Sequence, residues 1–315
     1  MSTENELRDA VVVGGGAAGL GAALTLARAR RNVTVIDAGQ PRNAPAEGAH
    51  GLVGQEGINP LELLERGRRE VAGYGAEVRN DEVTDVTGAV GDFAVALRSG
   101  EVLHARRLVI ATGLVDELPE IPGLWEQWGR NVVHCPYCHG WEVRDRKIAV
   151  LGTGPMMVHQ TLMFHQLSRD ITLFSRGLEI SAEDRRTLDA LGIPVISEEV
   201  TEVISEGDRL TGVKLADGAV HAAEAVAVGT RMVARTGAFG GIGITASEHP
   251  MGSFIATDEF GRAEVPGVWV AGNATDLGAQ VGAAAAAGVK AAAHLNYDLI
   301  NEDAVAAVAA ASAVG

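Results

Sequence analysis

Cysteine is nearly absent from this chain: its 315 residues contain two, Cys135 and Cys138, which are separated by two residues. A framework of several disulfides is therefore excluded, because it would need more cysteines. The two thiols are close enough in sequence to form a disulfide with each other. A chain that places all its thiols in one C-x-x-C motif is more typical of a protein that handles electrons than of one that braces its fold.

Basic clusters are missing as well. The chain has 26 Lys and Arg against 41 Asp and Glu, which gives a formal net charge of −15. This balance argues against nucleic acid and against an anionic membrane surface as partners, because both attract positive charge. It suits a soluble enzyme, but it identifies no substrate.

The chain also lacks a clear membrane span or targeting signal. The apolar stretch 279–295 is short and contains Lys290 and His294, so it does not predict a membrane helix. The first nine residues are polar and charged, unlike a signal peptide. We therefore expect a cytoplasmic protein, in which a C-x-x-C motif is catalytic or metal-binding more often than structural. The apolar residues 304–315 are interpreted as a frayed helix or a docked tail.

Glycine and apolar residues, in contrast, are abundant. The chain has 40 glycines and 47% hydrophobic residues, which is typical of an α/β protein. Its length predicts two domains. The first recognisable unit is a strand, a glycine-rich turn, a helix and a second strand, at residues 10–13, 14–19, 20–29 and 33–37.

This first unit has the pattern of a dinucleotide-binding turn. Gly14, Gly16 and Gly19 fit G-x-G-x-x-G, and Asp37 follows about 20 residues later at the end of the second strand. Gly14 permits the tight turn, Gly16 lets the backbone approach a pyrophosphate, and Gly19 lets the helix pack on the strand. Asp37 can accept hydrogen bonds from a ribose. The sequence therefore predicts a dinucleotide site here.

A second unit of the same kind, at residues 147–174, is degraded. The third glycine position holds Met157, whose bulk should push the helix away from the strand, and Pro155 removes a backbone donor from the turn. No acidic residue ends the following strand, which disfavours NAD. Arg176 is the one residue there that could meet the 2′-phosphate of NADPH.

Two further strands end in small residues that would let a cofactor lie against the backbone, at 108–113 and 268–276. Residues 279–281 open an alanine-rich helix after the second of them. The N-terminus of that helix offers free N–H groups and a positive dipole, which suit the negative charge of a reduced flavin. Asp276 is interpreted either as functional or as a cap of this helix.

The order of these motifs resembles that of the low-molecular-weight thioredoxin reductase family, over about residues 8–300. The resemblance implies an α/β fold of two Rossmann-like, three-layer ββα nucleotide-binding domains, the second inserted in the first. It places a discontinuous FAD domain at 1–117 and 237–315, and an inserted NAD(P)H-type domain carrying the C-x-x-C motif at 118–236. It also implies a homodimer.

The resemblance further implies which residues contact FAD. They are Gly14, Gly16, Ala17, Ala18, Asp37, Arg42, His50, Val83, Ala111, Thr112, Gly113, Gly272, Asn273, Gln280 and Val281. His50 is interpreted either as a second base near the flavin or as an ordinary loop residue.

The departures from thioredoxin reductases are concentrated near the thiols and in the second unit. Those enzymes have Asp after the second cysteine, where this chain has His139, and a His-Arg-Arg run where it has Phe174-Ser175-Arg176. Asn273 also replaces an Asp. The combination resembles the dithiol oxidase branch of the family, which forms the disulfides of natural products such as holomycin and gliotoxin and passes electrons from FAD to oxygen.

This resemblance predicts the chemistry of the site. A small-molecule dithiol has thiol pKa values of about 8.5, so a base with a pKa of about 6.5, such as histidine, would help at neutral pH. We expect His139 to be this base, with His134 flanking the motif on the other side. Cys135 would take the substrate thiolate as a mixed disulfide, and Cys138 would pass electrons to the flavin.

Other interpretations remain open. An NADPH-dependent disulfide reductase would need the second unit to bind nicotinamide despite Met157. A redox-sensing flavoprotein without turnover would use the same cysteines. The run from His134 to His139 could also supply four metal ligands, although adjacent residues rarely share a tetrahedral centre. We expect no metal.

Overall fold

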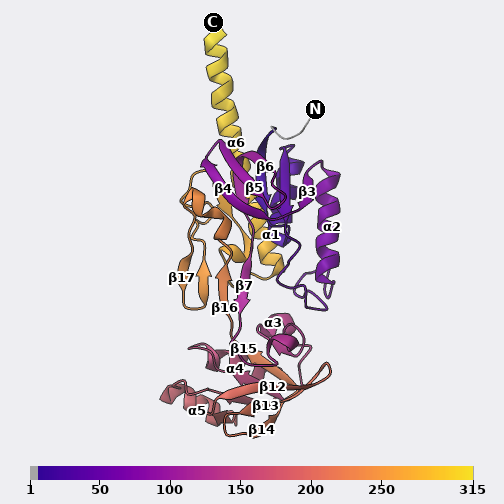
Figure 1. The fold of residues 1–315 in the computed structure, drawn as a ribbon, viewed down its shortest axis with the longest axis vertical. Helices are drawn as coiled ribbons and strands as arrows, with labels where there is room; N and C mark the ends of the chain where they lie inside the picture. The colour runs from indigo at the N-terminus through magenta and orange to yellow at the C-terminus, as the bar shows by residue number, and fades with distance from the viewer. Residues whose placement is uncertain (1–5, 315) are drawn as a thin grey trace. The chain divides into compact units, whose positions relative to one another are not determined.

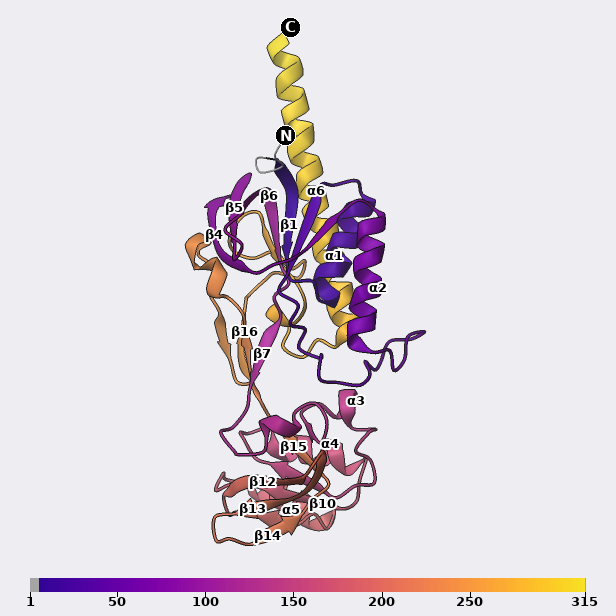
Figure 2. The same cartoon turned by 45° about the vertical axis from the view of Figure 1, so that its right-hand side comes forward.

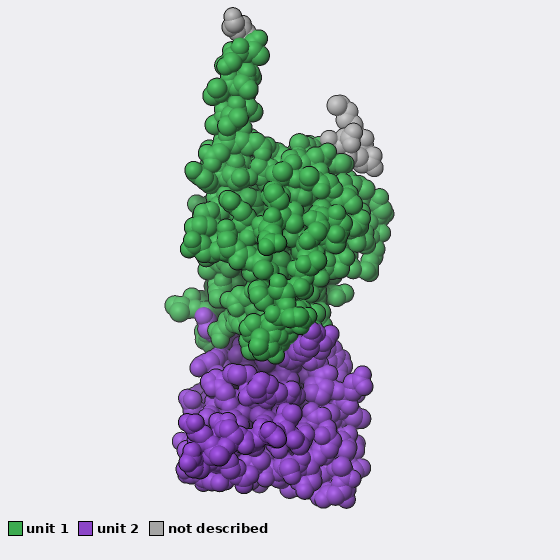
Figure 3. All heavy atoms as spheres, turned by 90° about the vertical axis from the view of Figure 1, so that its left-hand side faces the viewer, with its two compact units in different colours: residues 1–44, 52–115, 232–315 green, residues 45–51, 116–231 purple. Residues whose placement is uncertain are grey.

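The computed structural model describes residues 6–314 and divides into two compact units. Unit 1 comprises residues 1–44, 52–115 and 232–315, and unit 2 comprises residues 45–51 and 116–231 (Figure 3). The predicted domain boundaries were 117/118 and 236/237, whereas this division passes between the units at 115/116 and 231/232 and groups 45–51 with unit 2. The first five residues of the predicted polar N-terminus lie outside the described residues.

Unit 1 is built on a seven-stranded sheet with the order β3-β2-β1-β6-β5-β4, in which β19 also pairs with β6. The strands are β1 (Leu7–Val13), β2 (Val33–Asp37), β3 (Glu77–Asn80), β4 (Val83–Ala89), β5 (Asp92–Leu97), β6 (Val102–Ile110) and β19 (Val268–Val270). Strands β3, β2, β1, β6 and β19 are parallel, whereas β4, β5 and β6 form an antiparallel meander.

Three helices lie together on one side of this sheet (Figures 1 and 2). They are α1 (Ala17–Arg28), α2 (Pro60–Gly73) and α6 (Val281–Val314). Alternate residues of β1 point to opposite faces, so Val12 packs with the helices and Val11 packs with the meander. The result is a three-layer ββα unit with a core on each face of its sheet.

Unit 2 repeats this architecture on a smaller scale. A parallel sheet has the order β11-β10-β9-β15-β8, and an antiparallel sheet has the order β12-β13-β14. These strands are β8 (Val132–Val133), β9 (Ile148–Leu151), β10 (Ile171–Phe174), β11 (Val195–Ile196), β12 (Val200–Glu206), β13 (Arg209–Leu215), β14 (Val220–Ala222) and β15 (Ala225–Val228). The helices are α3 (Pro136–His139), α4 (Met157–His165), α5 (Ala182–Ala190) and the 3-10 turn η2 (Trp125–Gln127).

The parallel sheet of unit 2 also separates two cores. Val150 packs with α4 and α5 on one face, and Leu151 packs with β12 and β13 on the other. The predicted fold class, two Rossmann-like ββα units with the second inserted in the first, is therefore confirmed.

A four-stranded sheet contains the segments where the chain passes from one unit to the other. Its order is β17-β18-β16-β7. Its strands are β7 (Leu114–Glu117), β16 (Arg231–Ala234), β17 (Ser247–His249) and β18 (Gly252–Phe254). The 3-10 turns η3 (Gly237–Ile242) and η4 (Gly272–Ala274) complete the described elements.

Helix α6 continues to Val314 without interruption, and its residues 301–313 are exposed. Neither predicted alternative for this end, a frayed helix or a docked tail, matches. The alanine-rich sequence has high helix propensity and contains no proline or internal glycine after residue 288, so nothing ends the helix earlier. Within the described part of the chain, none of the helices combines the length and apolar character that crossing a bilayer requires.

The helix starts differ in their capping. Asn59 caps α2 by accepting hydrogen bonds from the amides of Leu61 and Glu62, and Ser181 caps α5. Helices α1 and α4, which follow the two glycine-rich turns, begin without a side-chain cap. Their first N–H groups are therefore not satisfied by a capping side chain, which is the arrangement that suits a phosphate.

Candidate redox site and nucleotide-binding turns

The C-x-x-C motif forms a single helical turn. Cys135 is the N-cap of α3 in an extended conformation, and Pro136 occupies the first helical position, where its fixed φ favours the helix. The amides of Cys138 and His139 both donate to the Cys135 carbonyl. This turn brings the two Sγ atoms to 2.7 Å, so little movement is needed to form a disulfide.

His139 ends this helical turn with a buried ring nitrogen. Its Nε2 atom has no hydrogen-bond partner among the described residues. Burial lowers the pKa of His139 below its ordinary value; Glu142 partly opposes this shift, and His50 adds to it. The imidazole is therefore neutral at neutral pH and able to accept a proton, as a general base must.

His134, on the other side of the motif, contacts the backbone of a neighbouring strand. Its Nδ1 atom lies 3.1 Å from the Val228 carbonyl oxygen, and its own carbonyl accepts a hydrogen bond from Gln160. These contacts hold the segment before Cys135 against β15 and α4. Among residues 6–314, no group of three or more His, Cys, Asp or Glu side chains is arranged so that it could hold a metal ion.

The segment 45–51 brings His50 to the redox unit. His50 Nε2 lies 3.4 Å from a carboxylate oxygen of Glu142. The segment is grouped with the unit that carries the cysteines, and the expected contact of His50 with FAD stays a prediction. Glu142 was missed by the sequence analysis, although a carboxylate three residues after His139 was a visible signal.

The first glycine-rich turn is tightly folded and open on its outer side. Gly14 has φ +112°, and a Cβ there would lie 2.3 Å from the Ala111 carbonyl oxygen. A Cβ on Gly19 would lie 1.8 Å from the Gly14 oxygen, so the helix packs closely on the strand. Gly16, in contrast, has open space beside it. Together with the uncapped start of α1, this geometry fits a pyrophosphate.

Asp37 lies against this turn at the carboxyl end of β2. A Cβ on Gly15 would be 2.5 Å from the Asp37 carboxyl group. One Asp37 oxygen accepts from the amide of Gly39, and the other lies 2.6 Å from the Arg68 guanidinium. The carboxylate is therefore held in place beside the turn, where a ribose would lie.

The other residues expected to contact FAD follow the carboxyl ends of strands in unit 1, with one exception. Ala17 and Ala18 begin α1, Arg42 follows β2, Ala111, Thr112 and Gly113 follow β6, Gly272 and Asn273 lie in η4, and Gln280 and Val281 lie at the start of α6. The exception is Val83, at the start of β4, whose side chain is buried in the core beneath the meander. Their contacts with FAD stay predictions.

Asn273 and Asp276 shape the loop that leads into α6. The Asn273 side-chain amide donates to the carbonyls of Asp276 and Ala279, both at 2.9 Å. Asp276 accepts from the amide of Gly278, two residues later. Its predicted role as a helix cap is wrong, because α6 begins at Val281.

In the second glycine-rich turn, a side chain packs against the first glycine. The Met157 sulfur would lie 2.8 Å from a Cβ on Gly152, so the thioether occupies the space beside that glycine. Arg176 donates two hydrogen bonds to one carboxylate oxygen of Glu199, one of them at 3.0 Å. The cation that could meet a 2′-phosphate is therefore paired with an acidic side chain.

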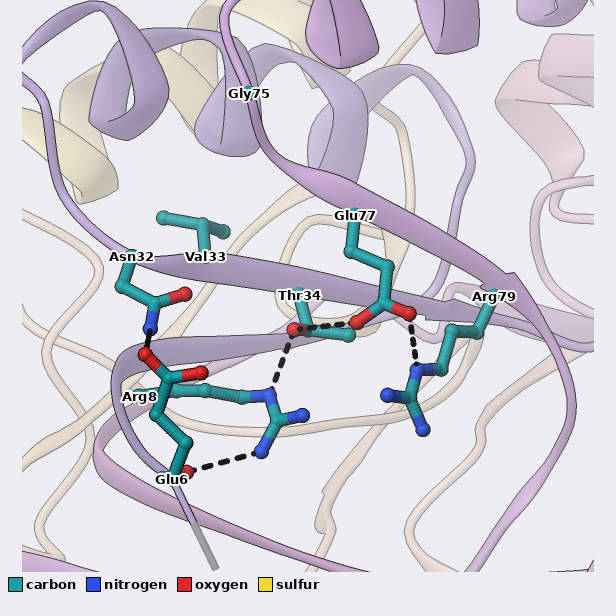
Figure 4. A pocket seen from close by; sticks show the side chains of 8 residues that line it. All are labelled: Glu6, Arg8, Asn32, Val33, Thr34, Gly75, Glu77 and Arg79. Atoms are coloured by element: carbon teal, nitrogen blue, oxygen red, sulfur yellow. Dashed lines mark hydrogen bonds and ion pairs between the residues drawn. The ribbon is translucent and has the colours of Figure 1, made fainter. Parts of the chain in front are cut away.

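A polar hollow elsewhere in unit 1 does not fit a nucleotide (Figure 4). It is lined by Glu6, Arg8, Asn32, Val33, Thr34, Gly75, Glu77 and Arg79. These residues lie at the amino ends of β1, β2 and β3, whereas ligands of open α/β sheets bind at the carboxyl ends. The side chains are also bonded to one another, as between Arg8 and Thr34 at 2.8 Å.

Known proteins share this arrangement over nearly the whole chain. Residues 8–292 match the family of pyridine nucleotide-disulphide oxidoreductases. Thioredoxin reductase tcpT from Claviceps purpurea is 30% identical over 285 residues, covering 87% of this chain and 88% of tcpT. Thioredoxin reductase sirT from Leptosphaeria maculans is 29% identical, covering 96% of this chain and 98% of sirT.

Among solved structures, HlmI is 47% identical, with a TM-score of 0.91 over 99% of this chain and 98% of HlmI. The matches confirm the predicted resemblance to thioredoxin reductases. The chain therefore belongs to the pyridine nucleotide-disulphide oxidoreductase family and is an oxidoreductase of the thioredoxin reductase-like type.

Proposed function

We propose that this protein is an FAD-dependent dithiol oxidase that forms a disulfide in a small natural-product dithiol and uses oxygen as the electron acceptor. The observation that carries the proposal is the contrast between the two nucleotide turns. The first turn has glycine at its third position, Gly19, and Asp37 beside it, whereas the second turn has Met157 at that position and its nearby cation, Arg176, is paired with Glu199. In this proposal NADPH is not the electron donor, and a dithiol is the donor that a C-x-x-C motif accepts.

Unit 1 would hold the FAD. The turn from Gly14 to Ala18 would receive the pyrophosphate, Asp37 the ribose, and the start of α6 at Gln280 and Val281 the flavin ring. When bound, FAD would accept the electron pair from the reduced cysteines and deliver it to oxygen, giving peroxide. Unit 2 would be the NAD(P)H-type domain, retained for its cysteines.

The cysteines and His139 would perform the thiol chemistry. A substrate thiol gives its proton to His139, and the thiolate attacks Cys135 Sγ of the oxidised pair. The Cys135–Cys138 bond breaks, and Cys138 leaves as a thiolate. His139 releases this proton to solvent and takes the proton of the second substrate thiol. That thiolate attacks the substrate sulfur of the mixed disulfide, which releases the cyclic product and the Cys135 thiolate. The net reaction is dithiol plus oxygen to disulfide plus hydrogen peroxide.

The comparisons support this proposal at the level of thiol–disulfide chemistry. HlmI matches the chain from end to end at 47% identity. The names of tcpT and sirT favour a second candidate, an NADPH-dependent disulfide reductase of the thioredoxin reductase type. The resemblance also leads us to propose a homodimer, which analytical ultracentrifugation would test.

Flavin absorbance under anaerobic conditions separates the two candidates. Excess NADPH is added to one sample of the flavin-loaded protein and dithiothreitol to another, and both are then exposed to air. The oxidase proposal requires bleaching by the dithiol alone, recovery of the yellow colour in air, and loss of the bleaching in Cys135→Ser. Rapid bleaching by NADPH would establish the reductase instead.

A further inference from the structure

A carboxylate and two histidines form a cluster beside the cysteines in unit 2. His139 ends α3, Glu142 lies in the turn that follows, and His50 is contributed by the segment 45–51. His50 Nε2 and Glu142 Oε1 are 3.4 Å apart. The thiol chemistry described above uses His139 alone, so Glu142 and His50 need a separate explanation.

The two neighbours of His139 act on it in opposite directions. The negative charge of Glu142 favours the protonated imidazole, whereas a positive charge on His50 disfavours it. Arg144, in the same turn as Glu142, has its guanidinium 4.0 Å from the Trp141 ring centroid and donates to the Trp141 carbonyl. Within this cluster, the basic side chain that lies against Glu142 is His50, at 3.4 Å.

Exposure also differs within the cluster. The side chain of Glu142 is 40% exposed and that of His50 is 24% exposed, whereas Nε2 of His139 is buried without a partner among the described residues. A buried imidazole that accepts a proton becomes a buried cation, which needs a nearby counter-charge. Glu142 is the carboxylate placed to supply it.

We infer that Glu142 is a positioning residue for the base, which stabilises His139 after it has taken the substrate proton, and that His50 competes with His139 for this carboxylate. The inference rests on the proposed function for its catalytic meaning. The three side chains then act together. Removing Glu142 or His50 changes how tightly His139 holds its proton, in a direction set by the charge that is removed.

The test is a pair of isosteric or nearly isosteric variants with opposite expected effects. Glu142→Gln removes the negative charge, so His139 holds its proton less tightly and the acid limb of the pH–rate profile moves to lower pH. His50→Asn removes a like charge and leaves Glu142 to His139 alone, so the acid limb moves to higher pH. We expect each shift to be about half to one pH unit, because the cluster is partly exposed.

The profile is measured as oxygen uptake by the flavin-loaded protein with dithiothreitol as substrate. Glu179→Gln, which removes an exposed carboxylate on another loop of the same unit, is the matched control and should leave the profile unchanged. Shifts of the same sign in the Glu142 and His50 variants, or no shift in either, would overturn the inference.

A second measurement separates this inference from the proposed function. NMR titration of the His139 ring, assigned with His139→Gln, follows the proton on the base without requiring turnover. If the wild type consumes no oxygen but the ring titration moves in opposite directions in the two variants, the cluster is as inferred and the oxidase proposal fails. If oxygen is consumed but the ring titration does not move, Glu142 has no such role.

Discussion

Three glycines in two similar turns allow backbone strain and ligand approach to be tested separately. Gly14→Ala combines a positive φ with a 2.3 Å clash, so we expect it to destabilise the chain by about 1–3 kcal/mol and to abolish flavin retention. A Cβ at Gly16 would meet open space, so Gly16→Ala should leave the melting temperature of the flavin-free protein unchanged. It should still reduce the flavin content, because the added methyl group would keep the pyrophosphate from the backbone. Differential scanning fluorimetry and the ratio of flavin to protein absorbance measure both effects.

The matching control lies in the second turn. Gly154 also has open space beside it and follows a strand of unit 2. Gly154→Ala should change neither stability nor flavin content, because the proposed flavin cradle is in unit 1. Equal loss of flavin in the Gly154 and Gly16 variants would contradict the assignment of FAD to the first turn.

The ion pair between Glu199 and Arg176 provides a second test at the level of single residues. Glu199→Gln removes the carboxylate that pairs with the guanidinium and would repel a phosphate. We expect binding of 2′-phosphorylated nucleotides to improve by about 3- to 10-fold, as an interaction of about 1 kcal/mol would give. Isothermal titration with 2′-phospho-ADP-ribose measures this gain, and adding Arg176→Ala should remove it. If the affinity is unchanged in Glu199→Gln, the ion pair with Arg176 does not limit the binding of 2′-phosphorylated nucleotides.

Helix α6 offers a test at the level of a whole element. Its residues 304–313 are exposed, whereas Glu302 and Asp303 form ion pairs with Arg106, and Arg107 pairs with Glu302 and Asp298. Deleting residues 304–315 should therefore leave the melting temperature nearly unchanged. Deleting residues 302–315 should cost about 1 kcal/mol or more, because the nearly buried Arg107 loses a partner. If the shorter deletion lowers the melting temperature strongly, the exposed turns of α6 contribute to stability through contacts with another molecule.

The elements themselves were largely predictable, because their signals are local. The strands at 10–13, 33–37 and 171–174 were each recognisable from an apolar run, and the glycine turn from its spacing. The pairing of His50 with Glu142 was not, because the two residues are 92 positions apart and no local pattern joins them. The same holds for Glu199, which lies 23 residues after Arg176 on a different loop.

The ends of the elements were harder to predict from the sequence than the elements themselves. The C-x-x-C motif contains no apolar periodicity that would predict a helix. The helical turn inside it begins at Pro136, whose fixed φ suits the first helical position. One of the two interpretations of Asp276 was as a helix cap, but α6 starts five residues later and the Asn273 side-chain amide holds the intervening loop. Side-chain contacts of this kind decide boundaries, and a single sequence does not reveal them.

For the molecule as a whole, the two units have separate hydrophobic cores, and only one of them is proposed to bind FAD. FAD that binds the folded form of unit 1 stabilises that unit by mass action, by about 2.7 kcal/mol at 100 times the dissociation constant. Scanning calorimetry of the flavin-free protein should therefore show one transition that rises with added FAD and one that does not.

A core substitution in each unit identifies the transitions. Phe164 is fully buried in unit 2 and Phe93 in unit 1. Phe164→Leu and Phe93→Leu should therefore each reduce the free energy of unfolding of one unit by about 1–2 kcal/mol and lower the temperature of its transition. FAD should raise the transition that Phe93→Leu lowers. If it raises the one that Phe164→Leu lowers, the cofactor binds unit 2 and the assignment of the two turns is reversed. If a single transition moves in every case, the units unfold together, and their separate cores do not make them thermodynamically independent.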